Sequence, residues 1–197
     1  MGKRALMRQK QQQQASQVIL AVLGILLFAA GAFSFYVLRT QDQAATQSSS
    51  SGSTIPAEVS LPAPSLSLKN INGRTESLLD YRDQVVLVNN WATWCPPCKA
   101  EMPTLVSYYQ DHLAEGFVII SIEAGESQQQ VQEFATQYKM TFPVWLDPDG
   151  AAMDAFKNQN LPSSYVIDRS GVIRVMWVGE INRAMLEKYV TPLLAKN

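Results

Sequence analysis

Two apolar patterns alternate along the C-terminal two thirds of the chain. Near-continuous apolar runs stand at the start of the segments 85–90 and 117–122. Such runs are typical of strands that are covered on both faces. Apolar residues spaced three or four positions apart predict amphipathic helices that begin after Cys95, Ser127 and Asn182. Strands that alternate with helices predict an α/β domain with a mixed central sheet sandwiched by helices.

Shorter patterns predict the remaining elements of this domain. Leu66, Leu68 and Ile71 alternate with polar residues ahead of Asn72-Gly73, which predicts an N-terminal hairpin. Short helices are expected at 78–81 and 152–156, and further strands at 142–146, 165–167 and 172–178, the last two as a hairpin.

The N-terminal region has a different pattern. Residues 1–17 are polar and basic, and 18–38 carries no charge over a length that, as a helix, would span about 31 Å and match a bilayer core. Basic residues are concentrated before this segment, so the positive-inside rule predicts a cytoplasmic N-terminus. A cleaved signal peptide is the alternative, because Ala30-Gly31-Ala32 resembles a cleavage site. The apolar character continues past this point and favours an uncleaved anchor.

Residues 39–59 are rich in Gln, Ser and Ala and carry almost no large apolar side chain. Such a segment cannot bury enough surface to order itself, so we expect a flexible tether. The expected organisation is a cytoplasmic tail at 1–17, a transmembrane helix at 18–38, a linker at 39–59 and one domain at 60–197. The protein is thereby predicted to be a single-pass membrane protein with its domain extracytoplasmic.

Charge and cysteine content exclude several classes of function. The 197 residues carry 16 basic and 17 acidic side chains with no basic stripe, which excludes a nucleic-acid partner. Two cysteines and one histidine are too few for a typical zinc site, so we expect no metal or other cofactor. The cysteine count favours a dedicated redox pair over a framework of structural disulfides.

Both cysteines lie in Cys95-Pro96-Pro97-Cys98, at the start of an expected helix. Unpaired backbone N–H groups at a helix N-terminus stabilise a thiolate, and the pKa of cysteines so placed can fall to roughly 3.5–7.5. We therefore predict that Cys95, at the exposed tip, attacks a substrate disulfide and that Cys98, turned inward, resolves the mixed disulfide. The buried stripe of this helix is expected to contain Cys98, Met102, Leu105, Tyr109 and Leu113.

The segment from Trp91 to Lys99 resembles the active-site segment of the thioredoxin superfamily, and the following Glu101-Met102-Pro103 resembles its membrane-tethered TlpA/ResA branch. Three further segments, 122–127, 142–147 and 161–165, extend the resemblance over about residues 60–197. The resemblance implies a thioredoxin-like fold with an N-terminal hairpin and one extra helix–strand insertion. It also implies a Cys95–Cys98 disulfide in the oxidised enzyme.

The resemblance also assigns the residues that contact a substrate. The superfamily places a cis-proline opposite the dithiol, so we expect a cis bond before Pro162, although most X-Pro bonds are trans. Leu161 and Pro162 are expected to bind the substrate chain together with Trp94, Pro96 and Pro97.

Glu101 is the third predicted catalytic residue, after Cys95 and Cys98. In the TlpA/ResA branch the acid at this position lies in a small cavity beside the dithiol, where it tunes the thiol pKa values and relays protons. On a generic helix it would instead be a solvated surface acid. Asn89 stands where cytosolic thioredoxins carry a buried acid, which shifts proton handling towards Glu101.

The resemblance implies a thiol–disulfide oxidoreductase that acts on the cysteines of other extracytoplasmic proteins. The expected function is the reduction of protein disulfides, such as the CxxCH haem-attachment site of apocytochrome c during cytochrome c maturation. The expected electron donor is a membrane thiol reductase, and we expect the protein to be a monomer.

Two other functions are considered. A thiol peroxidase would need a threonine and a proline three and seven residues before its reactive cysteine, where this chain has Ala92 and Val88. A copper- or metal-delivery module could use Cys95 and Cys98, but the sequence offers no third soft ligand.

Overall fold

The computed structural model describes residues 56–195. The predicted tail at 1–17, the predicted transmembrane helix at 18–38 and nearly all of the predicted linker lie outside the described residues. Within residues 56–195, no helix is both long enough and apolar enough to cross a membrane.

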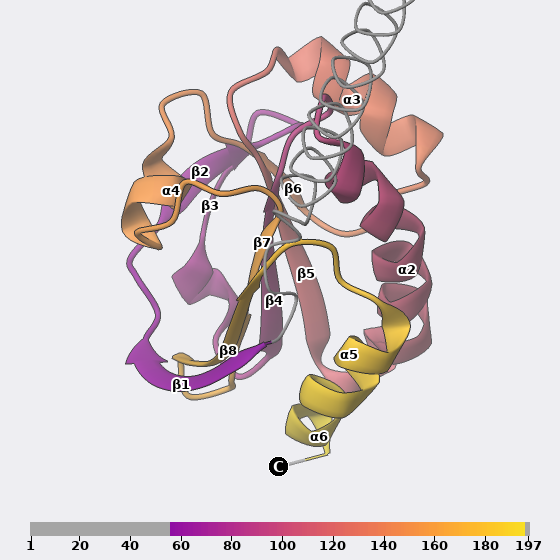
Figure 1. Ribbon diagram of the computed structural model, residues 1–197. Helices are drawn as coiled ribbons and strands as arrows, with labels where there is room; N and C mark the ends of the chain where they lie inside the picture. The colour runs from indigo at the N-terminus through magenta and orange to yellow at the C-terminus, as the bar shows by residue number, and fades with distance from the viewer. Residues whose placement is uncertain (1–55, 196–197) are drawn as a thin grey trace, which may run out of the picture. The chain divides into compact units, whose positions relative to one another are not determined.

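Eight strands form one mixed sheet at the centre of the domain (Figure 1). They are β1 Ala57–Pro62, β2 Ser67–Asn70, β3 Thr75–Ser77, β4 Val85–Trp91, β5 Phe117–Glu123, β6 Val144–Leu146, β7 Ser163–Ile167 and β8 Val172–Val178. Their order across the sheet is β1-β8-β7-β4-β5-β6-β2-β3. The neighbours β4, β5 and β6 are parallel, and all other neighbours are antiparallel. The predicted mixed sheet and the predicted N-terminal hairpin, β2–β3, are confirmed.

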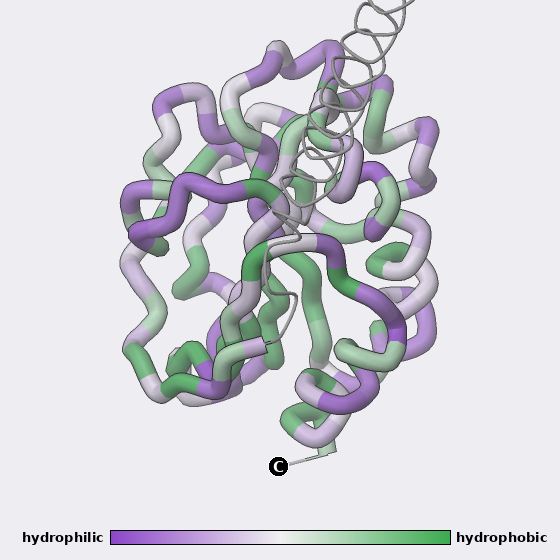
Figure 2. The backbone as a smooth tube through the Cα atoms, viewed as in Figure 1, coloured by the Kyte–Doolittle hydropathy of each residue, from purple (hydrophilic) through white to green (hydrophobic). Residues whose placement is uncertain are grey.

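The two central strands are buried along their whole length. Every residue of β4 and β5 is buried, as their apolar runs predict. Figure 2 shows hydrophobic residues along the central strands and hydrophilic ones on the outer helices and loops. The same burial extends to the polar residues near the ends of these strands, Asn89, Asn90 and Glu123. Because β4 and β5 are parallel and in register, these polar side chains come to one edge of the sheet.

The helices are α2 Pro96–His112, α3 Gln128–Gln137, α4 Ala151–Ala155, α5 Arg183–Tyr189 and α6 Thr191–Leu194, with 3-10 turns η1 at Leu78–Tyr81 and η2 at Leu113–Glu115. Successive right-handed crossovers, β4-α2-β5 and β5-α3-β6, place α2 and α3 on the same face of the sheet. Figure 1 shows α5 on that side as well and α4 on the other. The thioredoxin-like sandwich of sheet and helices is therefore confirmed.

Side-chain caps fix the starts of two predicted helices. Ser127 accepts a hydrogen bond from the backbone N–H of Gln130, whose side chain in turn accepts from the backbone N–H of Ser127. The side chain of Asn182 accepts from the backbone N–H of Met185 at 3.0 Å. Both helices begin where the sequence predicts because these caps satisfy N–H groups that have no partner within the helix.

Several predicted boundaries are wrong. β6 begins at Val144 instead of 142, and β7 begins at Ser163 instead of 165. The linker predicted at 39–59 overlaps β1, which begins at Ala57 and pairs with β8. The alternation of Ala57, Val59 and Leu61 with polar residues is typical of a strand, but five of the six residues of β1 are exposed. Leu113 is 58% exposed instead of buried, because α2 ends at His112 and the helical phase changes in the following 3-10 turn.

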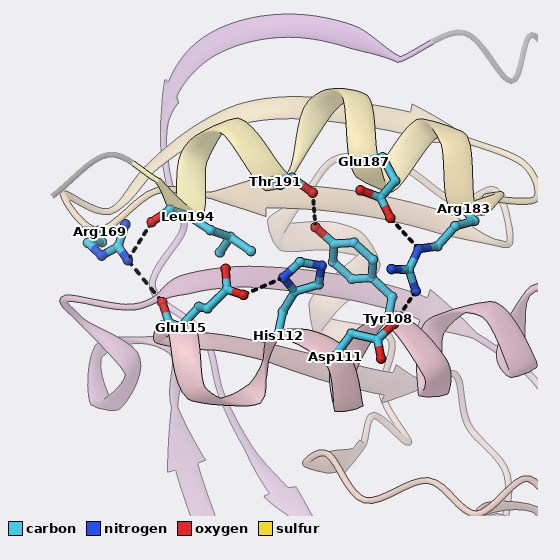
Figure 3. Close-up of polar contacts among 9 residues, drawn as sticks. All are labelled: Tyr108, Asp111, His112, Glu115, Arg169, Arg183, Glu187, Thr191 and Leu194. Atoms are coloured by element: carbon cyan, nitrogen blue, oxygen red, sulfur yellow. Dashed lines mark hydrogen bonds and ion pairs between the residues drawn. The ribbon is translucent and has the colours of Figure 1, made fainter.

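The C-terminal half of α2 is fixed to α5 and α6 by polar contacts (Figure 3). The Tyr108 hydroxyl lies 2.9 Å from the hydroxyl of Thr191. Arg183 donates to Asp111 on α2 and to Glu187 on α5, both at 2.6 Å. These contacts hold the C-terminal half of α2 in place. The cysteines therefore lie at the N-terminus of a helix whose other end is fixed.

Candidate active site

The two cysteines form a disulfide at the start of α2, with their Cα atoms 5.3 Å apart. Cys95 is the N-cap residue, and its Sγ accepts a hydrogen bond from the backbone N–H of Cys98 at 3.3 Å. Pro96 and Pro97 occupy the first helical positions, where a proline costs no hydrogen bond. The N–H group aimed at Sγ and the partial positive charge of the helix end would both favour a Cys95 thiolate in the reduced protein.

Cys95 is not at an exposed tip, contrary to the sequence-based prediction. It is 3% exposed, and Cys98 is fully buried. The N–H of Cys95 donates to the carbonyl of Ala92 at 3.2 Å, which closes a turn and directs the residue inward. Its neighbour Trp94 is 65% exposed instead. A substrate would therefore meet the indole ring first and the sulfur atom second.

The peptide bond between Leu161 and Pro162 is cis, as the resemblance implies. It immediately precedes β7, whose first residue, Ser163, pairs with Asn90 near the end of β4. The carbonyl of Pro162 accepts from the N–H of Gly179 at 2.9 Å. The sheet thus brings the cis-proline to the same edge as the dithiol.

The five predicted substrate-binding residues differ in accessibility. Trp94 and Pro96 are exposed, Pro97 and Leu161 are half-buried, and Pro162 is buried. Only the first two offer a large free surface, while Pro162 has a backbone position fixed by the sheet.

Glu101 is fully buried on α2, three residues after Cys98. One carboxyl oxygen accepts from the Asn89 side-chain amide at 2.8 Å, and the other accepts from the backbone N–H of Ile181 at 2.9 Å. Burial raises the pKa of Glu101 to about 8, although both hydrogen bonds act in the opposite direction. The alternative interpretation as a solvated surface acid is therefore wrong. Near neutral pH this carboxyl group can hold a proton and release it.

Asn89 connects Glu101 to the strand that follows the cis-proline. Its side-chain amide also donates to the hydroxyl of Ser164 on β7 at 3.1 Å. The amide at this position thus links α2 to β7 through hydrogen bonds, where a carboxyl group would have added a second buried acid.

Sequence analysis missed a second polar group at the active-site turn. Glu126 accepts hydrogen bonds from both the backbone N–H and the hydroxyl of Thr93, which lies two residues before Cys95. Glu126 and the buried Glu123 both fall in the segment 122–127 that carries part of the family resemblance. Nothing in that segment indicates that its acids contact the turn, because the contact depends on how β4 and β5 align.

No group of three or more His, Cys, Asp or Glu side chains in the described part of the chain could hold a metal ion.

Comparisons with known proteins agree with this site. Residues 59–176 match the AhpC/TSA family. The chain is 33% identical to the thiol-disulfide oxidoreductase ResA of Bacillus subtilis (strain 168) over 128 residues, which cover 65% of this chain and 72% of ResA. It is 29% identical to ResA of Geobacillus thermodenitrificans (strain NG80-2) over 178 residues, which cover 90% of this chain and 96% of that protein.

Among solved structures, a thiol:disulfide interchange protein DsbE from Chlorobium tepidum superimposes with a TM-score of 0.65 at 26% identity, covering 71% of this chain and 99% of the other. These proteins share the dithiol chemistry that the geometry of Cys95 and Cys98 supports. The chain therefore belongs to the thioredoxin-like AhpC/TSA family and is a thiol–disulfide oxidoreductase of the ResA/DsbE type.

Proposed function

We propose that this protein is a membrane-tethered extracytoplasmic reductase of protein disulfides, with the CxxCH site of apocytochrome c as a representative target. The observation that carries the proposal is the Cys95–Cys98 pair at the N-terminus of α2. The uncharged segment 18–38 supports the tether. So does the ResA match, which covers 90% of this chain and thus extends beyond the folded domain.

The reaction is two successive thiol–disulfide exchanges. The Cys95 thiolate attacks one sulfur of the substrate disulfide, so that a mixed disulfide forms and a substrate thiolate leaves. Cys98 then loses its proton and attacks the Cys95 sulfur, which releases the second substrate thiolate. Two electrons pass to the substrate, both substrate thiolates gain protons, and the enzyme is left with the Cys95–Cys98 disulfide that this structure contains.

Glu101 supplies the proton handling that the second exchange requires. Cys98 is fully buried, so water cannot readily remove its proton. Glu101 lies one helical turn further along α2, and burial raises its pKa to about 8, which suits proton transfer near neutral pH. The carboxylate can take the thiol proton and later return it to solvent or substrate.

The surface around the dithiol suits a polypeptide substrate. Trp94 and Pro96 are exposed and offer apolar contact, with Pro97 and Leu161 beside them. Pro162 would present backbone groups for pairing with an extended chain. Substrate pairing places a protein cysteine, rather than a small thiol, against Cys95. The Cys95–Cys98 disulfide is then reduced again by a membrane thiol reductase.

Substitution of the two cysteines tests this function. The purified full-length chain should catalyse the reduction of insulin disulfides by dithiothreitol, and Cys95→Ser should abolish this catalysis, because the attacking sulfur is lost. Cys98→Ser should accumulate mixed disulfides, because the resolving thiol is lost, and mass spectrometry of these would identify the substrates. Activity that persisted in Cys95→Ser would show that the mechanism is wrong.

The tether is tested separately through topology. A reporter that is active only outside the cytoplasm, fused after Asn197, should be active, and the protein should remain with membranes after a carbonate wash. Release of a shorter mature form would show that the segment at 18–38 is cleaved.

A further inference from the structure

A second buried carboxyl group lies at the end of β5, where Glu123 is in register with Trp91 of β4. Glu123 is fully buried, and the half-buried Glu126 follows it in the next turn. The backbone N–H of Glu126 donates to both carboxyl oxygens of Glu123, at 3.1 and 3.0 Å. The two carboxyl groups also interact with each other, which raises the pKa of Glu123 and lowers that of Glu126. A hydrogen bond between two carboxyl groups requires that one of them carry a proton.

Glu126 in turn holds the turn that carries Cys95. One of its oxygens accepts from the backbone N–H of Thr93 at 2.7 Å, and the other accepts from the Thr93 hydroxyl. Thr93 lies inside the turn that is closed by the hydrogen bond from Cys95 to Ala92. Both donated bonds need acceptor oxygens, and bonds of this kind are strongest when the carboxyl group is ionised.

The surrounding charges decide which acid keeps the proton. Burial raises the pKa of Glu123 to about 8, and the negative charges of Glu126 and Asp147 add to the effect. Burial acts on Glu126 as well, but the hydrogen bonds from Thr93 and Glu123 and the attraction of Lys99 on α2 leave its pKa below the ordinary value. Near neutral pH, Glu123 is therefore the donor and Glu126 the ionised acceptor.

We propose that Glu123 and Glu126 form a proton-sharing pair that positions the Cys95 turn for thiol–disulfide exchange, acting through Thr93. The proposal rests on the exchange reaction of the proposed function. When the two carboxyl groups share one proton, the contact with Glu123 holds Glu126 in place, and Glu126 accepts the hydrogen bonds from Thr93. When that proton is lost, Glu123, Glu126 and Asp147 are all negative, and their mutual repulsion pushes Glu126 away from the turn. Thiol–disulfide exchange at Cys95 then slows, although the higher pH favours the thiolate form of Cys95.

Three substitutions test this pair, because they distinguish the loss of the shared proton from the loss of the hydrogen bonds. Glu123→Gln keeps a donor towards Glu126 but cannot ionise. Glu126→Gln loses one of the two acceptor oxygens that hold Thr93, and Thr93→Val loses the hydroxyl donor without changing any acid. Glu133→Gln is the matched control, because Glu133 is an exposed acid on α3 that lines the same pocket as Thr93 but accepts a hydrogen bond from Gln129.

The measurement is the single-turnover rate at which the reduced full-length chain reduces a small peptide disulfide, from about pH 6 to about pH 10. The parent rate divided by the Glu123→Gln rate at each pH cancels the ionisation of the thiols. This ratio should stay near one up to about pH 7 and fall about ten-fold above about pH 8, where Glu123 ionises. Glu126→Gln and Thr93→Val should each be slower at every pH, and Glu133→Gln should match the parent.

The outcomes separate this proposal from the proposed function. If Cys95→Ser is inactive but the ratio is flat across the whole range, exchange occurs and the positioning pair is wrong. If Cys95→Ser is active, the exchange mechanism itself fails. Far-UV circular dichroism shows whether Glu126→Gln folds, and if it does not, Thr93→Val tests the same contact. A parent-like rate in Thr93→Val together with a flat ratio would overturn the proposal.

Discussion

Two acids, Glu101 and Glu123, are equally buried and yet lie in opposite surroundings. Both are fully inaccessible to solvent, and burial raises the pKa of each to about 8. Glu101 accepts from two donors, the amide of Asn89 and the backbone N–H of Ile181, and the negative charge of Glu180 adds to the rise in its pKa. Glu123 has a backbone donor but lies beside two further acids, Glu126 and Asp147.

Burial determines how far the pKa of each carboxyl group is raised. The groups beside it determine what its ionisation does to the structure. An ionised Glu101 keeps both of its hydrogen bonds, and these grow stronger with the charge. An ionised Glu123 can no longer donate to Glu126 and is repelled by it. Glu101 is therefore suited to exchanging protons without structural change, and Glu123 is suited to retaining its proton.

The largest expected effect of these two acids is on the free energy of unfolding and its dependence on pH. In each acid the pKa is raised from 4.5 to about 8 in the folded state, so the folded chain binds more protons than the unfolded chain between these values. Stability is therefore full below about pH 4.5, falls as the pH rises through this window, and levels off above about pH 8. Glu101→Gln and Glu123→Gln should each reduce this loss by about 2 to 4 kcal/mol.

The measurement is the free energy of unfolding of the oxidised full-length chain in urea, at about pH 5 and about pH 8. Glu133→Gln serves as the control and should lose as much stability as the parent, since Glu133 is exposed. If either buried variant kept the parent's full dependence on pH, that acid would be ionised in the folded protein across the window, and its assigned pKa would be wrong.

Much of the fold could be predicted because apolar runs, caps and turns are local. The first four residues of β4 and of β5 are all apolar, and Ser127 and Asn182 each cap a helix through a residue three positions away. The linker prediction missed β1 although Ala57, Val59 and Leu61 alternate with polar residues, because the alternation is short and follows directly on the Ser-rich segment. Its pairing with β8 is made across the whole domain.

The site was only partly predictable for the same reason. The cysteines, the cis-proline and the acid on α2 lie in motifs that a sequence displays. The hydrogen bonds from Thr93 to Glu126, in contrast, join residues 33 positions apart. The burial of Cys95 likewise depends on a turn whose closure to Ala92 no apolar pattern encodes. The alignment of the parallel strands β4 and β5 decides the first feature, and the geometry of a local turn decides the second.

A smaller effect concerns the thiols themselves. Glu101 lies one helical turn after Cys98, and a carboxylate near two thiols competes with them for ionisation, because like charges close together are costly where water is excluded. Glu101→Gln should therefore lower the apparent pKa of the Cys95 thiol, by about half a unit to one unit. The measurement is the alkylation rate of Cys95 against pH in the reduced full-length chain, with far-UV circular dichroism as the control for folding.

Glu123→Gln is the matched comparison for this shift. Below about pH 7 the parent's Glu123 is neutral, so replacement by a neutral amide should leave the alkylation profile in that range unchanged. A profile shifted only by Glu101→Gln would assign thiol tuning to the acid on α2 and leave positioning to the pair at the end of β5. Equal shifts in both variants would mean that the two acids act on Cys95 through charge alone, which removes the distinction between them. Superimposable profiles in all three proteins would leave Glu101 without a role in tuning the thiol.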